Sequence, residues 1–320
     1  MKHLFGPVPS RRLGFSLGID VIPAKTCTLN CVYCQLGPTP ELTLERKPYV
    51  PAETIIAEVS KLLQKNPRID FLTFSGSGEP TLNSDLGKMI WGLKKITLIP
   101  VAVITNGSLF YQKEVRQDLR EADVVLPSLD AVSGESFRKI NRPHPDLKSK
   151  VMIEGLRKFS REYPGKIWLE VMLVKGINDS KAELEKIRAI IKSLRMDRVR
   201  HSLLLAKANK VQLNTVVRPP AEEGFFPLTQ LELKTAAEII GSGCEIIAEF
   251  TGVKTTGTFQ GSEKLILETL KRRPLTLKDV TAVTGLTRSE VIKIIGCLVQ
   301  KNAIQIRRIK KEEYYVSVSP

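Results

Sequence analysis

Short apolar runs alternate with helix-periodic segments through most of the first 250 residues, and this alternation limits the possible folds more than any other feature of the chain. Residues 71–74 form an apolar run of strand length, and residues 52–65 before them place apolar side chains at helical spacing. The same patterns recur, predicting strands at 17–22, 71–74, 100–104, 123–126, 167–174 and 199–205 and helices at 52–65, 85–94, 115–121, 148–161 and 181–194. Strands that alternate with helices of this length indicate a parallel sheet, either open or closed into a barrel.

Polar and glycine-rich segments follow these predicted strands. In chain order they are Ser75-Gly76-Ser77-Gly78-Glu79-Pro80, Asn106-Gly107, Ser128-Leu129-Asp130, Asn178-Asp179 and Gln212-Leu213-Asn214. Ligand sites of parallel α/β folds lie beyond the carboxyl ends of the strands, so we expect these segments on one rim of the sheet. Each segment alone is as typical of a turn as of a ligand contact, but in chain order they support one another.

The segment TCTLNCVYCQLG, residues 26–37, carries three cysteines between two predicted strands. It spaces Cys27, Cys31 and Cys34 as C-x3-C-x2-C and places Tyr33 just before the last cysteine. A structural zinc or a fully ligated iron–sulfur cluster takes four protein ligands, so three thiols leave one metal position without a side chain. Soft thiolates suit zinc, copper(I) or an iron–sulfur cluster, and the loop alone does not distinguish these metals. The loop therefore predicts an open metal site.

The cysteine count argues against a disulfide framework. The chain of 320 residues holds five cysteines, an odd number and far from the dense usage of small secreted domains. The sequence shows no secretory leader pattern and no apolar run of membrane-spanning length, so we expect a cytoplasmic protein that makes no membrane contact. A zinc site completed by a distant residue stays as the alternative metal site.

The cysteine spacing with its aromatic residue resembles the cluster loop of the radical S-adenosylmethionine (SAM) superfamily. In that family three cysteines hold a 4Fe-4S cluster, and the amino and carboxylate groups of SAM chelate the fourth iron. Ser77-Gly78-Glu79-Pro80 resembles the family's Gly-Gly-Glu-Pro motif, which receives the SAM amino group, with Ser77 in place of the first glycine. Ser128 and Asp130 resemble a Ser-Leu-Asp segment near the ribose and methionine portions.

The resemblance implies a fold, two cofactors and a set of site residues. The fold would be α/β, a partial (β/α)6 TIM-like barrel over residues 1–250, and the cofactors a 4Fe-4S cluster and SAM. The implied metal ligands are Cys27, Cys31 and Cys34. The implied cofactor-binding residues are Tyr33, Ser77, Gly78, Glu79, Pro80, Asn106, Ser128, Asp130, Asn178 and Asn214. Radical generation needs no side chain as acid or base, so no catalytic residue is predicted.

Two further segments narrow the resemblance. One branch of the superfamily, described as iron–sulfur oxidoreductases, has segments similar to two in this chain, the opening Gly6-Pro7-Val8-Pro9-Ser10-Arg11-Arg12 and the stretch 211–220. This branch is related to enzymes that form the wyosine base of tRNA. Those tRNA enzymes use extra cysteines for a second cluster, which this chain lacks. The paired arginines sit in a rigid Pro/Gly frame that suits binding of a carboxylate or phosphate, although an edge hairpin is the preferred interpretation.

The composition changes at residue 251, where Thr, Gly and Lys residues through 262 predict a linker. Beyond it, helices are predicted at 263–271, from 276 or 277 to 283, and at 288–301, followed by a hairpin of residues 303–309 and 314–318. This plan resembles the winged helix-turn-helix domain, assigned here to residues 263–320. Basic residues that could meet phosphates are Lys271, Arg272, Arg273, Arg307, Arg308, Lys310 and Lys311. Winged helices also bind proteins, but the basic clusters favour nucleic acid.

Two functions follow from these features. In the first, the chain is an enzyme that cleaves SAM reductively to a 5′-deoxyadenosyl radical for hydrogen abstraction from an RNA base or a protein residue, with a reduced donor such as ferredoxin or flavodoxin. In the second, the cluster senses redox state or iron and the winged domain regulates transcription. A net charge of +15 favours an anionic partner in either case, or is simply a solvated surface. A sensor has no need of the Gly78-Glu79 and Ser128–Asp130 segments, so the sequence favours the enzyme.

Overall fold

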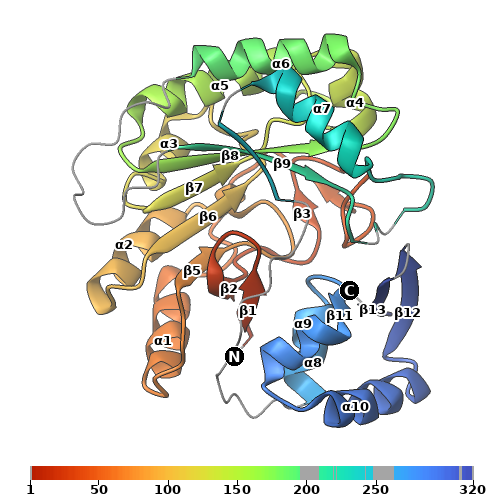
Figure 1. Cartoon of the computed structure of the whole chain (residues 1–320). Coiled ribbons are helices and arrows are strands. Elements are labelled where there is room, and N and C mark those ends of the chain that lie inside the picture. Colours follow the sequence, from red (N-terminus) through yellow and green to blue (C-terminus); the bar gives the residue numbers. More distant parts are fainter. Residues whose placement is uncertain are drawn as a thin grey trace.

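A computed structural model describes residues 2–194, 209–218, 220, 222–241, 243–247, 263–309 and 312–318. Figure 1 shows a curved sheet whose outer face is covered by helices, with a smaller unit from the carboxyl-terminal part of the chain beside its first strands. The predicted linker 251–262 and the predicted strand 199–205 lie outside the described residues.

In the part of the chain that the structure describes, the large sheet has eight strands in the order β1-β2-β5-β6-β7-β8-β9-β10. Their bounds are Leu4–Ser10, Gly14–Ile19, Phe71–Phe74, Val101–Thr105, Val124–Pro127, Lys166–Leu173, Lys210–Thr215 and Cys244–Ile246. β1 pairs antiparallel with β2, which confirms the edge hairpin, and every other neighbouring pair is parallel. The α/β class is thus confirmed. Within the described residues the sheet is mixed and has seven parallel strands, against six in the expected (β/α)6 pattern. Two of them, β9 and β10, lie where no strand was predicted.

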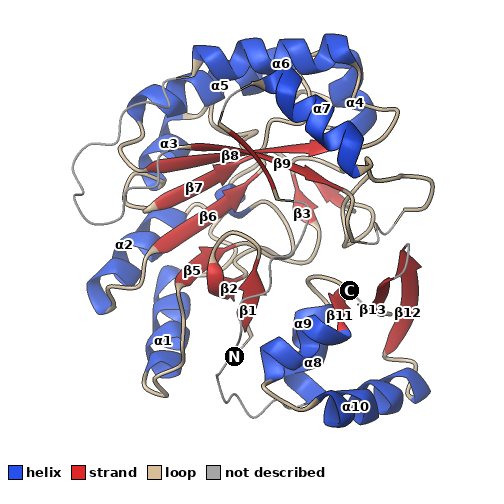
Figure 2. Ribbon diagram, viewed as in Figure 1, coloured by secondary structure: helices blue, strands red, loops and turns tan. Residues whose placement is uncertain are grey.

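Seven helices of the described chain accompany this sheet (Figure 2). They are α1 (Ala52–Leu63), α2 (Leu86–Ile96), α3 (Lys113–Asp118), α4 (Gly134–Asn141), α5 (Ser149–Glu162), α6 (Lys181–Ser193) and α7 (Gln230–Ile240). Each long helix turns an apolar stripe to the sheet; in α1 the stripe is Ile55, Val59 and Leu62, which are fully buried. Side chains of Ser133, Ser180 and Thr229 cap the first turns of α4, α6 and α7.

The smaller unit contains the three helices and the hairpin that the sequence predicted. They are α8 (Glu263–Leu270), α9 (Leu277–Thr284), α10 (Arg288–Gln300), β12 (Ile304–Ile309) and β13 (Glu312–Ser317). A short strand β11 (Leu275–Thr276) pairs with β13, giving a sheet in the order β11-β13-β12. This unit has its own apolar core, which includes Ile266, Val291 and Leu298.

The unit packs on the first hairpin of the large sheet. Phe5 and Val8 of β1 contact Val283 of α9 and Leu265 of α8 in one apolar cluster. The Tyr314 hydroxyl of β13 donates to the Val217 carbonyl, 2.9 Å away, just beyond β9. The unit therefore lies against both β1 and the carboxyl end of β9. Among the described helices, none is long and apolar enough to cross a membrane.

Candidate metal and cofactor site

The cysteine loop leaves the end of β2 and lies against the rim of the sheet. It contains the short strand β3 (Thr26–Cys27), which pairs with β4 (Glu41–Leu42). Two backbone hydrogen bonds join the loop to the segment after β5: Lys25 N donates to Ser77 O (2.7 Å) and Glu79 N donates to Thr26 O (3.1 Å). The two strongest sequence motifs are thereby neighbours in space.

Each of the three loop cysteines is half-buried and free, and each sulfur receives a side-chain N–H donor from a different residue. Asn106 Nδ2 lies 3.6 Å from the sulfur of Cys27, and Asn141 Nδ2 lies 3.4 Å from that of Cys31. Lys25 Nζ lies 3.1 Å from the Cys34 sulfur. Amide and ammonium donors stabilise negative charge on sulfur, so the site suits thiolate ligands.

The thiols are also close to buried carboxylates. Burial raises the pKa of Cys27 to about 12, and the nearby Glu79 carboxylate adds to this rise. Burial likewise raises the pKa of Cys31, with Asp130 as the second cause. A cation at the sulfurs would reverse both effects, because metal binding displaces the thiol protons.

Gly78 allows the close approach between the two motifs. A Cβ atom placed on Gly78 would lie 1.9 Å from the Thr26 carbonyl oxygen, so no other residue fits without moving the backbone. Next to it, Ser77 donates to Asp20 from its amide (3.1 Å) and its hydroxyl (2.5 Å). Arg272 of the smaller unit donates to the same carboxylate at 3.0 Å. The segment is therefore held from both sides, by the cysteine loop and by the smaller unit.

Glu79 is 2% exposed and is the centre of a dense hydrogen-bond network. Its Oε1 accepts from Thr81 N (3.1 Å), Thr81 Oγ1 (2.6 Å) and Thr105 Oγ1 (2.5 Å). Oε2 accepts from Asn106 N at 2.7 Å. Burial raises the pKa of Glu79 although these donors oppose the rise. One carboxylate oxygen is thus committed to the rim, whereas Oε2 retains capacity for a further donor.

Asp130, like Glu79, is a buried carboxylate that accepts several hydrogen bonds beside the cysteine loop. Its Oδ2 accepts from Tyr33 Oη (2.5 Å) and Asn141 Nδ2 (2.8 Å), and its Oδ1 accepts from Met172 N (3.0 Å). Burial raises the pKa of Asp130 to about 6, the donors acting against it. Since Tyr33 precedes Cys34, this network fastens the cysteine loop to β7 and β8.

The remaining predicted site residues lie around these networks in different settings. Asn178 is fully buried, and its amide bonds the carbonyls of Asp130 and Met172 and the amide of Val174. Asn178 therefore fixes the backbone at Asp130 to the end of β8. Ser128 forms an isolated bridge with Glu170 at the end of β7, and Pro80 is the buried first residue of a 3-10 turn, Pro80–Leu82.

Asn214 lies inside strand β9, not in a loop beyond a strand as the sequence indicated. Its side chain donates to Glu170 (2.8 Å) and accepts from Arg11 (3.1 Å), while Arg12 makes a 2.7 Å ion pair with Glu170. These polar and charged side chains form one hydrogen-bonded cluster. Asn214 is the last residue but one of β9, and its role in cofactor binding stays a prediction.

Sequence reasoning missed two donors at the cysteines, Lys25 and Asn141. Lys25 directly precedes the cysteine loop and has a left-handed backbone conformation (φ 59°), for which the sequence gives no signal. Asn141 begins the polar, proline-framed segment Asn141-Arg142-Pro143, a loop composition that could have drawn attention to it. Its partner Cys31 is 110 positions away in the chain, so only the fold reveals the contact.

The donor set fits an iron–sulfur cluster. In the described part of the chain, no three His, Cys, Asp or Glu side chains are placed to hold a single metal ion. A four-iron cluster binds each thiolate to a different iron, so its ligands need only surround it. The three thiols come from one loop and have N–H donors at their sulfurs, which is the ligand chemistry that such a cluster takes.

Comparison with known proteins gives a consistent result. Residues 21–188 match the family model of the Radical SAM superfamily. A protein of Brachyspira hyodysenteriae named GTPase Obg is 40% identical over 307 residues, which cover 95% of this chain but 43% of that protein's length. A UPF0026 protein of Methanocaldococcus jannaschii is 37% identical over 297 residues, covering 92% of this chain and 85% of the relative.

A solved structure shares the fold. A radical SAM methyltransferase from Sphaerobacter thermophilus superimposes with a TM-score of 0.50 at 16% identity, covering 72% of this chain and 65% of that one. Because the family model covers more than half of the residues and includes the cysteine loop, the chain belongs to the Radical SAM superfamily and is an enzyme of that superfamily.

Proposed function

We propose that Cys27, Cys31 and Cys34 hold a 4Fe-4S cluster and that SAM binds at the rim formed by the segments after β5, β6 and β7. When bound, the reduced cluster and SAM supply a 5′-deoxyadenosyl radical for hydrogen abstraction from a substrate. The observation that carries this proposal is the set of three N–H donors, one to each sulfur, from Lys25, Asn106 and Asn141.

The chain's own residues bind and orient. Gly78 lets the backbone of the Ser77–Pro80 segment run beside the cysteine loop, so this segment would border a cluster held by the three cysteines. Glu79 Oε2 can accept from an ammonium group such as the SAM amino group. Asp130, with Tyr33 and Asn141, holds the loop and the end of β7 in fixed relation.

The smaller unit is proposed to be a winged helix-turn-helix domain that presents a macromolecular substrate, an RNA or a protein. Three helices followed by a three-stranded sheet support this assignment. Arg272 ties the unit to Asp20 and through it to Ser77, so the unit is fastened to the proposed SAM segment. This fastening favours a substrate-presenting role over a free DNA-binding regulator. A reduced ferredoxin or flavodoxin is the proposed electron donor.

The test is formation of 5′-deoxyadenosine by anaerobically reconstituted protein with SAM and a strong reductant. We expect wild type to form it and Cys31→Ala to form none, because one iron loses its ligand. Cys297→Ala, which removes a cysteine on α10, is the matched control and should keep the activity. If wild type with an intact cluster forms no 5′-deoxyadenosine, with or without cell extract, the proposal is wrong.

A further inference from the structure

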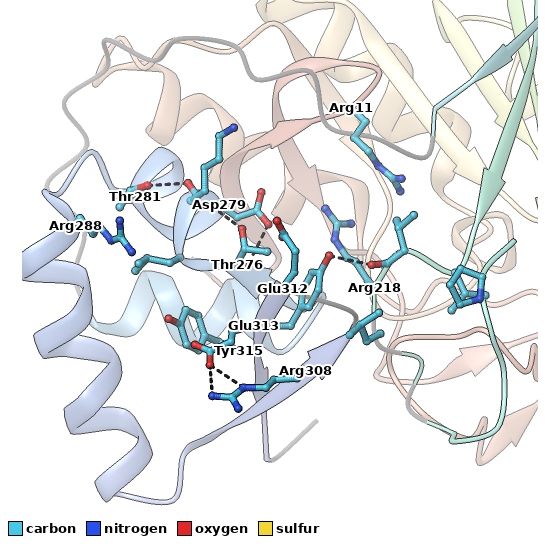
Figure 3. A pocket seen from close by; sticks show the side chains of 17 residues that line it. Arg11, Arg218, Thr276, Asp279, Thr281, Arg288, Arg308, Glu312, Glu313 and Tyr315 are labelled. Atoms are coloured by element: carbon cyan, nitrogen blue, oxygen red, sulfur yellow. Dashed lines mark hydrogen bonds and ion pairs between the residues drawn. The ribbon is translucent and has the colours of Figure 1, made fainter. Parts of the chain in front are cut away.

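A large cavity lies between the large sheet and the smaller unit, and no residue of the cysteine loop lines it. Its volume is about 1220 Å³, and its walls are the end of β9, the first turn of α9 and the β12–β13 hairpin. In Figure 3, Arg11 and Arg218 reach it from the side of the large sheet, whereas Arg288 and Arg308 reach it from the smaller unit, where Arg308 is paired with Glu313. A cavity of this size can hold a substrate of several hundred daltons or the end of a larger one.

Arg218 is the unusual residue of this cavity. It is half-buried, and within the part of the chain that the structure describes its guanidinium makes no hydrogen bond or ion pair. The acid that most affects it is Asp279, but the Asp279 carboxylate accepts from Thr276 N (3.0 Å) and caps helix α9. A half-buried guanidinium with five donors and no acceptor is an incomplete arrangement.

A second guanidinium faces it. Arg11, in the turn between β1 and β2, donates to the amide oxygen of Asn214 and, at 3.0 Å, to the carbonyl of Ile247. These contacts fix its position at the cavity wall. Burial and then repulsion by Arg218 lower the pKa of Arg11 to about 10, so the charge of Arg218 disfavours that of Arg11. Two like charges held together in this way are relieved when an anion binds between them.

Arg11 of this pair is connected toward the cysteine loop through residues of β9 and β8. From Arg11 the connection runs through Asn214 to Glu170, which also binds Arg12. Glu170 lies on β8, and the amide of Met172 on the same strand donates to Asp130, which accepts from Tyr33 of the cysteine loop. Contacts along β9 and β8 thus lead from the cavity wall to the cysteine loop.

We propose that Arg11 and Arg218 bind a phosphate group of the substrate, so that the substrate enters through this cavity with its reacting part directed toward the cysteine loop. This inference rests on the proposed function and specifies its substrate class as a phosphate ester, either a free nucleotide or the backbone of RNA. A carboxylate is satisfied by one guanidinium fork, whereas a phosphate presents enough oxygens for two forks arriving from different strands. We therefore expect the site to bind phosphate groups and not a peptide that carries carboxylates, and the test below includes such a peptide.

The experiment measures binding of inorganic pyrophosphate to the full-length, cluster-containing protein by calorimetry, without SAM or reductant. Wild type should bind it, and Arg218→Gln should bind at least about 10-fold more weakly because a charged donor is lost. Arg161→Gln, at an exposed residue of α5, removes the same charge and should bind like wild type. Arg218→Lys keeps the positive charge but loses the bidentate guanidinium, so its affinity for pyrophosphate should lie between those of Arg218→Gln and Arg161→Gln. If Arg218→Gln does not fold, the comparison of Arg218→Lys with Arg161→Gln tests the proposal.

Competition identifies the source of the phosphate. Displacement of pyrophosphate by a 12-nucleotide single-stranded RNA indicates a backbone phosphate, and displacement by guanosine or adenosine triphosphate alone indicates a free nucleotide. Equal binding by Arg218→Gln and Arg161→Gln, or no pyrophosphate binding by wild type, would overturn the proposal. Arg218-dependent binding of a glutamate-rich peptide without binding of pyrophosphate would also overturn it. None of these measurements depends on 5′-deoxyadenosine formation, so failure of phosphate binding can be told apart from failure of the proposed function.

Discussion

Two buried carboxylates, Glu79 and Asp130, flank the cysteine loop, and their hydrogen-bond donors come from different parts of the chain. Glu79 takes all its donors from residues of the rim itself, Thr81, Thr105 and Asn106. Asp130 takes its donors from Tyr33, Asn141 and Met172, which lie in the cysteine loop, in α4 and in β8. Each carboxylate also faces a different thiol, Glu79 facing Cys27 and Asp130 facing Cys31. The Glu79 side therefore shapes the rim, whereas the Asp130 side fastens the loop to it.

The largest expected effect comes from Gly78, on the Glu79 side. Gly78→Ala places a Cβ 1.9 Å from the Thr26 carbonyl oxygen, and backbone atoms on both segments must move apart. We expect a loss of stability on the order of 3 kcal/mol, the upper part of the range for overpacking, and loss of 5′-deoxyadenosine formation. Urea denaturation of the cluster-free protein and the activity assay measure the two effects.

Gly296→Ala is the control for this change. Gly296 lies within α10 and a Cβ there meets nothing within 4 Å, so alanine should stabilise the protein by about 0.5–1 kcal/mol. A Gly78→Ala protein as stable as wild type would show that the cysteine loop and the Ser77–Pro80 segment are not in contact in solution.

The second-largest expected effect is a loss of stability when the Glu79 carboxylate, with its rim donors, is changed to an amide. Glu79→Gln replaces an acceptor oxygen with an amide group, which leaves at least one buried donor among Thr81, Thr105 and Asn106 without an acceptor. We expect a destabilisation of about 1–3 kcal/mol in urea denaturation. Glu185→Gln, at an exposed position of α6, should change stability by less than about 0.5 kcal/mol. Equal effects of the two substitutions would mean that the Glu79 network does not hold the rim.

The two sides also differ in how far the sequence predicted them. The β5 strand was predicted with its observed bounds because Phe71–Phe74 is apolar throughout and is followed by glycines. Glu79 and Gly78 follow it directly, so their position on the rim could be inferred. Lys25 and Asn141 could not be recognised as donors, since their contacts depend on how separate segments meet in three dimensions.

Other elements were missed for reasons that lie in tertiary packing. The sequence of α4, Gly134–Asn141, has two large apolar residues, Phe137 and Ile140, too few to give a helical period. Strand β9 carries Gln212 and Asn214, which are both buried, and Asn214 contacts the charged groups of Glu170 and Arg11. Polarity alone therefore does not distinguish a rim loop from a strand that faces a polar interior.

The smallest effect, a dependence on pH, should belong to the Asp130 side. Burial raises the pKa of Asp130 to about 6 in the folded chain, above about 3.9 for an unfolded aspartate, so the ionised carboxylate destabilises the fold above pH 6. As the pH falls through 6 the folded state takes up a proton first, and stability rises until the pH nears 4. Relative to Asp130→Asn, the cluster-free wild type should gain about 1 kcal/mol between pH 7.5 and 5. Urea midpoints at both pH values give this difference. A constant difference would mean that the Tyr33 and Asn141 donors fully offset the burial of Asp130 and that the loop is fastened without a raised pKa.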